Sequence, residues 1–192
     1  MSFVAQVRLA DVPALRRFTN VLASFHYCVK CSYEGRMSHG WDDERGNKGG
    51  YDVAFLDTSR ENPDRCGIVA ESIVAPHTVV SFRDVVEIPK WEDLDLDIFD
   101  LPRDYPQGDD DFDEKIYPGL VHVARTKVGG WPTWVQSPAW PPNRAGTEVE
   151  LICQLDWWLC EDAPWCNGGY AYVFAKVLPG EQLVGELAIL TT

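Results

Sequence analysis

The chain has 192 residues, a formal net charge of −13 and 45% hydrophobic residues. A chain of this length buries roughly 70% of its unfolded surface, so composition excludes wholesale disorder and predicts one domain over residues 1–192. No uncharged apolar run approaches the roughly 20 residues that a membrane helix needs, and charged residues interrupt the start where a signal peptide would be apolar. We therefore expect a cytoplasmic protein that makes no contact with a membrane.

The charge balance also bears on partners and on cysteine chemistry. A strongly negative chain repels phosphate and gains nothing from counterion release, which argues against nucleic acid as a partner. In a reducing compartment the six cysteines are expected to be thiols or metal ligands, and we predict no structural disulfide.

The first predicted element is a helix near residue 11. Asp11 is a candidate N-cap, and Pro13 stands near the first turn. Apolar residues follow at the spacing of one helical face: Leu15, Phe18, Val21 and Leu22.

After Phe25 the pattern changes to short runs rich in Val, Ile, Tyr and Phe, separated by Gly, Pro and Asn. These predicted strands cover 53–56, 68–69, 78–82, 120–124, 149–155, 170–177 and 183–190. The predicted fold class is α+β, mostly antiparallel β-sheet with one or two helices.

A short sequence match suggests two pseudo-equivalent halves. Tyr51 follows Gly49 and Gly50 at the start of one predicted strand, and Tyr170 follows Gly168-Gly169 at the start of another. Duplication would explain both copies, and chance similarity of two short segments is the alternative.

An acidic insertion runs from Trp91 to Glu114. It holds eleven acidic residues and one arginine, a local charge of −10 out of −13. Apolar residues interleave with the acids, so the segment is either a solvated loop or an acidic surface for a basic partner. The second interpretation makes Trp91, Asp109, Asp110, Asp111, Asp113 and Glu114 partner-binding candidates.

Cys28 and Cys31 have the spacing of a zinc-ligand pair, and His26 and His39 lie near them. A second pair with this spacing is absent from the sequence. Structural zinc, a redox pair and unmodified thiols all stay open, and we predict that the purified chain carries no stoichiometric zinc or other cofactor.

The sequence offers no recognisable catalytic motif. The four histidines could serve as bases, but no serine stands in a Gly-x-Ser-x-Gly elbow and no phosphate-binding loop is present. We therefore name no catalytic residue.

Tryptophans are concentrated in the last third of the chain: Trp131, Trp134, Trp140, Trp157, Trp158 and Trp165. Such large apolar side chains fill cores, but tryptophan is also strongly enriched among binding hot spots. On the second interpretation Trp131, Trp134 and Trp140 join the partner-binding candidates.

Three blocks between residues 127 and 174 carry a family resemblance. They are Lys-Val-Gly-Gly-Trp-Pro-Thr-Trp-Val-Gln from Lys127, Leu-Ile-Cys-Gln-Leu-Asp from Leu151, and Asn-Gly-Gly-Tyr-Ala-Tyr-Val-Phe from Asn167. In order and spacing they resemble the YwqG-like domain family, and the first block is similar to a turn of programmed cell death protein 2. Gln136, Gln154 and Asp156 are expected to satisfy buried backbone groups around the glycine turn.

The resemblance implies no agreed enzymatic activity. Bacterial relatives recur near polymorphic toxin systems, which implies an immunity protein that binds a cognate toxin, and the acidity of this chain suits a basic nuclease toxin. The alternative is a small-molecule-binding or metal-dependent enzyme with a pocket near Trp131 and Trp134.

Overall fold

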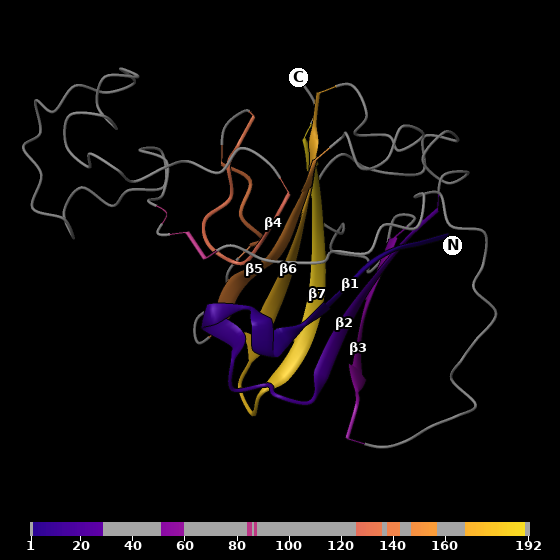
Figure 1. The fold of residues 1–192 in the computed structure, drawn as a ribbon, viewed down its shortest axis with the longest axis vertical. Coiled ribbons are helices and arrows are strands. Elements are labelled where there is room, and N and C mark those ends of the chain that lie inside the picture. Colours follow the sequence, from indigo (N-terminus) through magenta and orange to yellow (C-terminus); the bar gives the residue numbers. More distant parts are fainter. Residues whose placement is uncertain are drawn as a thin grey trace, which may run out of the picture.

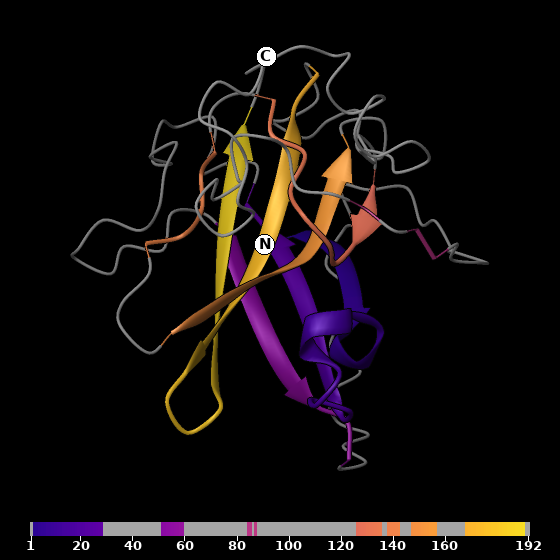
Figure 2. The same cartoon turned by 90° about the vertical axis from the view of Figure 1, so that its left-hand side faces the viewer.

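The computed structural model describes residues 2–28, 51–59, 84–85, 87, 126–135, 138–142, 147–156 and 168–190. Within them the chain forms two antiparallel sheets. The first contains β1 (Ser2–Arg8), β2 (Val21–Tyr27) and β3 (Tyr51–Asp57), in the order β1-β2-β3. The second contains β4 (Lys127–Val128), β5 (Glu148–Asp156), β6 (Tyr170–Leu178) and β7 (Gln182–Leu190), in the order β4-β5-β6-β7. Figure 1 shows the two sheets beside each other, and Figure 2 shows them turned by 90°.

Four predicted strands are confirmed, because 53–56, 149–155, 170–177 and 183–190 fall in β3, β5, β6 and β7. The runs at 68–69, 78–82 and 120–124 lie outside the described residues, as does the whole acidic insertion. The mostly antiparallel architecture is therefore confirmed, whereas the α+β class and the two pseudo-equivalent halves remain predictions.

The predicted N-terminal helix is wrong. The segment begins with β1, passes through two short 3-10 helices, η1 (Leu9–Asp11) and η2 (Pro13–Leu15), and enters β2 at Val21. Backbone hydrogen bonds link Val12 to Leu9, Leu15 to Val12, Phe18 to Leu15 and Val21 to Phe18. A spacing of three residues is the repeat of a 3-10 helix, so the apolar positions follow that tighter turn and not an α-helix. Leu9, Val12 and Leu15 are at most 1% exposed.

The main core lies between the sheets. Ala23, Phe25 and Tyr27 of β2 face it from one side, and Val173 and Ala175 of β6 face it from the other. These residues alternate along their strands, as side chains on one face of a strand must. The sheets come closest where β3 passes β7, and there Gly185 lies against Val53: a Cβ at residue 185 would be 2.9 Å from the Val53 carbonyl oxygen.

A β-bulge in β5 determines which of its side chains face the main core and which face the opposite side of the sheet. The register shifts between Leu151, which pairs with Phe174, and Cys153, which pairs with Val173. Ile152 and Cys153 both belong to the main core, while Leu151 belongs to a second cluster together with Phe174 and Tyr172. An extra residue in a strand turns the following side chains to new faces, so the bulge also sends Gln154 outward, toward the segment that carries the site.

Candidate functional site

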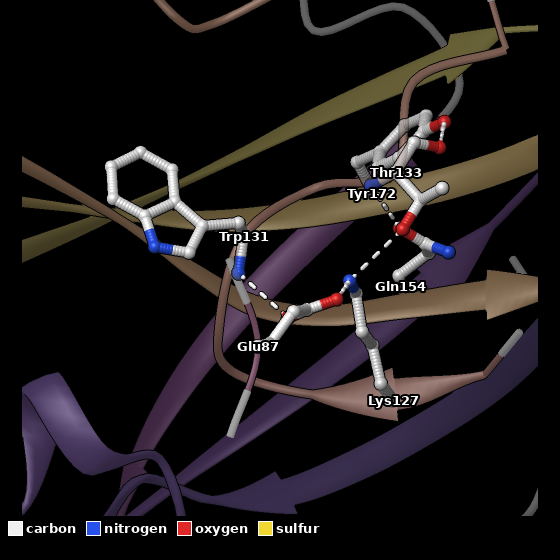
Figure 3. A network of polar contacts seen from close by, with 6 residues as sticks. All are labelled: Glu87, Lys127, Trp131, Thr133, Gln154 and Tyr172. Atoms are coloured by element: carbon white, nitrogen blue, oxygen red, sulfur yellow. Dashed lines mark hydrogen bonds and ion pairs between the residues drawn. The ribbon is translucent and has the colours of Figure 1, made fainter. Parts of the chain in front are cut away.

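The outer face of the second sheet carries a row of three polar side chains. Lys127 of β4 pairs with Gln154 of β5, which pairs with Tyr172 of β6, so the three residues stand side by side across three strands. All three reach Thr133, which follows β4 by five residues along the glycine turn, and Figure 3 shows their side chains meeting there.

Each polar group of Thr133 is held by a different member of the row. Lys127 Nζ donates to Thr133 Oγ1 at 3.0 Å, the Thr133 N–H donates to Gln154 Oε1 at 2.8 Å, and the Tyr172 hydroxyl donates to the Thr133 carbonyl at 2.7 Å. Thr133 is 6% exposed, so without these partners its backbone groups would be buried and unsatisfied. Gln154 therefore has the predicted structural role.

Glu87 completes the network. One carboxylate oxygen pairs with Lys127 Nζ, and the other accepts the Trp131 N–H at 3.1 Å. Both charged side chains are only 9% exposed. Burial lowers the pKa of the Lys127 ammonium below its usual value, whereas its hydrogen bond and charge interaction with Glu87 oppose that shift.

Two glycines allow the turn to lie this close to its neighbours. Gly129 and Gly130 have φ angles of 69° and 76°, in the left-handed region that L side chains rarely adopt. A Cβ at residue 129 would lie 2.9 Å from Pro13 Cδ, and one at residue 130 would overlap the Glu87 carboxylate. The Gly129 N–H also donates to the carbonyl of Ile152 at the bulge, at 2.9 Å.

The tryptophans of the turn have different environments. Trp134 is 2% exposed and lies 4.7 Å from the Tyr172 ring and 6.2 Å from the Phe174 ring, measured between centroids. Half-buried Trp140 packs at 5.7 Å from Trp134 and 5.4 Å from Phe174. Trp131 is 39% exposed and meets Trp140 edge to face at 6.1 Å, and Figure 3 shows its ring pointing away from the polar network. Of the three candidates only Trp131 presents a large exposed surface.

The remaining predicted partner-binding residues lie outside the described residues: Trp91, Asp109, Asp110, Asp111, Asp113 and Glu114. Glu87 was not predicted. It interrupts an apolar run, Val85-Val86-Glu87-Ile88, and a single carboxylate in such a run was the available signal for a buried ion pair. Gln136 also lies outside the described residues, and Asp156 is 8% exposed, with its N–H donating to Thr126 Oγ1 at 3.1 Å.

Ser24, His26 and Cys153 are potentially reactive side chains that lie outside this network. Ser24 Oγ and His26 Nε2 lie 2.8 Å apart on β2, but Ser24 is 2% exposed, so its hydroxyl is shielded from a substrate. Cys153 lines a small apolar void of about 10 Å³ between the sheets, and burial raises the pKa of its thiol to about 12. The part of the chain that the structure describes contains no group of three potential metal ligands, and Cys31 and His39 lie outside it.

The described residues thus define a two-sheet β domain whose glycine turn is clamped onto the outer face and presents one tryptophan. The chain belongs to the family of the domain of unknown function DUF1963, whose model matches residues 1–177. No curated protein and no solved structure matches the chain. None of the helices in the described ranges is long and apolar enough to cross a membrane.

Proposed function

We propose that this chain is a cytoplasmic protein-binding module, an immunity protein that neutralises a cognate basic bacterial toxin by direct binding. The observation that carries the proposal is Trp131. The residue is 39% exposed, while its backbone N–H is held by the buried carboxylate of Glu87. Tryptophan is enriched among interface hot spots because it offers a large contact area at a low entropic cost, and a backbone held in place lowers the entropic cost of binding further.

The charge supports a basic partner. A chain with a net charge of −13 attracts a basic protein over several ångströms, which raises the rate of encounter and disfavours acidic competitors. A nuclease toxin is typically basic because it binds a phosphate backbone. The negative charge of this chain would therefore raise the rate of association with such a toxin.

The resemblance to the YwqG-like family supports the same proposal. In the motif from Lys127 to Trp134, the side chain of Thr133 and both of its backbone polar groups are bound by Lys127, Gln154 and Tyr172, which is the arrangement of a structural motif. YwqG-like bacterial proteins recur near toxin systems, and the similarity to programmed cell death protein 2 rests on the same turn. We place the enzyme alternative second, because Lys127 is engaged by Glu87 and Thr133 and therefore has little capacity left for a substrate.

The experiment uses the intact chain as bait in cells that carry its neighbouring genes. We expect it to capture one basic protein that is toxic when expressed alone and harmless when this chain is expressed with it. Capture of no such protein, or toxicity that persists on co-expression, would contradict the immunity function. Turnover of a small molecule by the purified chain would favour the enzyme alternative.

The acidic insertion is tested with the captured protein. Replacement of Asp109, Asp110, Asp111, Asp113 and Glu114 by Asn and Gln should slow association several-fold and flatten its dependence on salt, with less change in dissociation. An association rate that is indifferent to both the substitutions and ionic strength would exclude electrostatic steering by this segment.

A further inference from the structure

Glu87 contacts the glycine turn through both of its carboxylate oxygens. Oε1 pairs with Lys127 Nζ, and Oε2 accepts the Trp131 N–H at 3.1 Å. Gly130 makes the second contact possible, because a Cβ at residue 130 would overlap Oε2. One oxygen therefore neutralises a buried lysine, whereas the other binds the backbone of the exposed tryptophan.

The bond to Oε2 fixes a residue that stands beside a flexible link. Gly129 and Gly130 directly precede Trp131, and glycine restricts the backbone less than any other residue. Pro132 follows and confines Trp131 to extended backbone angles, but it does not determine where the residue lies. Among the residues that the structure describes, Glu87 is the only hydrogen-bond partner of Trp131.

The position of the Trp131 ring depends on this backbone position. The ring meets Trp140 edge to face at 6.1 Å, and Trp140 in turn packs at 5.7 Å from buried Trp134. An edge-to-face pair requires a particular distance and angle between the rings, so a shift of the Trp131 backbone would also loosen the ring contact. An aromatic side chain that is already ordered loses less entropy when a partner binds it.

We propose that Glu87 is a positioning residue for partner binding, whose Oε2 holds Trp131 in the orientation that a partner protein contacts. The part that concerns binding rests on the proposed function, whereas the effect on the order of Trp131 does not. Loss of the bond leaves the indole itself unaltered, so the residue loses order and keeps its contact area. A side chain that must be ordered on binding weakens affinity about two- to tenfold.

Three variants separate the bond to Trp131 from the ion pair. In Glu87→Gln one oxygen remains and the Lys127 ammonium attracts it, so the amide NH2 faces the Trp131 N–H and the bond is lost. In Lys127→Met the carboxylate still accepts that N–H, although it is buried without a counter-charge. In the double variant no ammonium competes, so the amide oxygen turns to Trp131 and restores the bond. Lys127→Met with Glu87→Leu removes both charges and the acceptor, and it replaces Glu87→Gln in the test if that variant does not fold.

The first measurement needs no partner. Relaxation of the ¹⁵N-labelled chain gives the order parameter of the Trp131 amide, which is about 0.85 in a rigid backbone and below about 0.6 in a flexible one. We expect high order in the unaltered chain, in Lys127→Met and in the double variant, and low order in Glu87→Gln. Unchanged order in Glu87→Gln, or an equal loss of order in Glu87→Gln and Lys127→Met, would overturn the proposal.

A second buried ion pair of the same sheet provides a matched control. Lys176 Nζ and Glu186 Oε1 lie 2.7 Å apart, and their side chains are 16% and 10% exposed. Glu186 belongs to β7, at the opposite end of the strand order from β4. Glu186→Gln should therefore lower stability without changing the order of Trp131. A comparable loss of order in this variant would show that loss of either ion pair loosens the turn, and would overturn the specific role of Glu87.

The captured partner provides the second measurement, and the two proposals fail separately. Titration calorimetry should show about two- to tenfold weaker affinity for Glu87→Gln and recovery in the double variant. A neutralised toxin that binds Glu87→Gln as tightly as the unaltered chain would remove the positioning role and leave the immunity function. Absence of any neutralised toxin, with a loss of Trp131 order confined to Glu87→Gln, would remove the immunity function and leave Trp131 positioned by Glu87.

Discussion

The two faces of β6 show how one strand serves two purposes. Its inward side chains are small and aliphatic, with Ala171, Val173 and Ala175 all at most 1% exposed. Its outward side chains are large, and Tyr172 and Phe174 are equally buried, beneath the glycine turn. Small residues let the two sheets approach closely, whereas aromatic residues give the turn a broad surface to pack on. The inner face holds the fold together, and the outer face holds Trp131 in position.

The largest expected effect comes from the tryptophan that fixes the turn to the outer face. Trp134→Ala should lower the free energy of unfolding by about 3–5 kcal/mol, because it removes a fully buried ring from the aromatic cluster. Trp131→Ala is the matched control in the same turn and should cost less than about 1 kcal/mol, since its ring is substantially exposed. Urea denaturation measures both. Similar losses in the two variants would mean that the Trp131 side chain stabilises the fold and is not kept available for contact with a partner protein.

Disruption of the ion pair between Lys127 and Glu87 should give the next largest loss of stability. Lys127→Met should cost about 3 kcal/mol, because it leaves the Glu87 carboxylate buried without a counter-charge. Adding Glu87→Gln to Lys127→Met should recover most of this loss, since a neutral amide oxygen can still accept the Trp131 N–H. Denaturation of the single and double variants forms a double-mutant cycle. Additive losses would show that the two charges contribute independently.

The close approach of the sheets is tested on the inner face. Gly185→Ala should cost about 1–3 kcal/mol, because the new Cβ overlaps the Val53 side chain and forces the sheets apart. Gly180 is the opposite case: it has a φ of 83°, and a Cβ added there would meet nothing within 4 Å, so Gly180→Ala should cost about 1 kcal/mol from backbone strain without any overlap. Differential scanning calorimetry compares them. A Gly185→Ala variant as stable as the unaltered chain would contradict the packing between β3 and β7.

The smallest effect appears only at alkaline pH. Burial raises the pKa of the Cys153 thiol from 9.0 to about 12, so the unfolded state loses its proton first. The contribution of Cys153 to stability is therefore complete below pH 9 and is lost as the pH rises toward 12. Cys153→Ala should flatten the decline in stability over this range, which urea denaturation at a series of pH values measures. An equal slope in the variant and the unaltered chain would contradict the buried state of this thiol.

The strands could be predicted wherever local pattern and tertiary structure agree. β5, β6 and β7 are runs of apolar and aromatic residues long enough to span the sheet, and their limits follow from the flanking glycines and charges. The N-terminal segment could not be assigned in this way, because a repeat of three is close to both the α-helical and the 3-10 spacing. Tertiary packing of Leu9, Val12 and Leu15 selects the tighter turn.

The site could be predicted only in part. The glycines and Gln154 were identified as parts of a turn fixed by side chains, because they stand in the sequence blocks that carry the family resemblance. Thr133 and Glu87 were not, since their importance arises from the register that aligns Lys127, Gln154 and Tyr172 across three strands. A single sequence contains no direct record of register, and the bulge at Ile152, which sets it, has no signature in the residues themselves.

The most direct measurement compares stability and affinity in one variant. For Trp131→Ala we expect a free energy of unfolding within about 1 kcal/mol of that of the unaltered chain. We expect its affinity for the captured basic protein to fall about 30-fold, corresponding to about 2 kcal/mol at an interface hot spot. Isothermal titration calorimetry and urea denaturation of the same preparation give both numbers. An unchanged affinity, or a loss of affinity matched by a loss of stability, would contradict the claim that the outer face of the second sheet holds Trp131 for a partner.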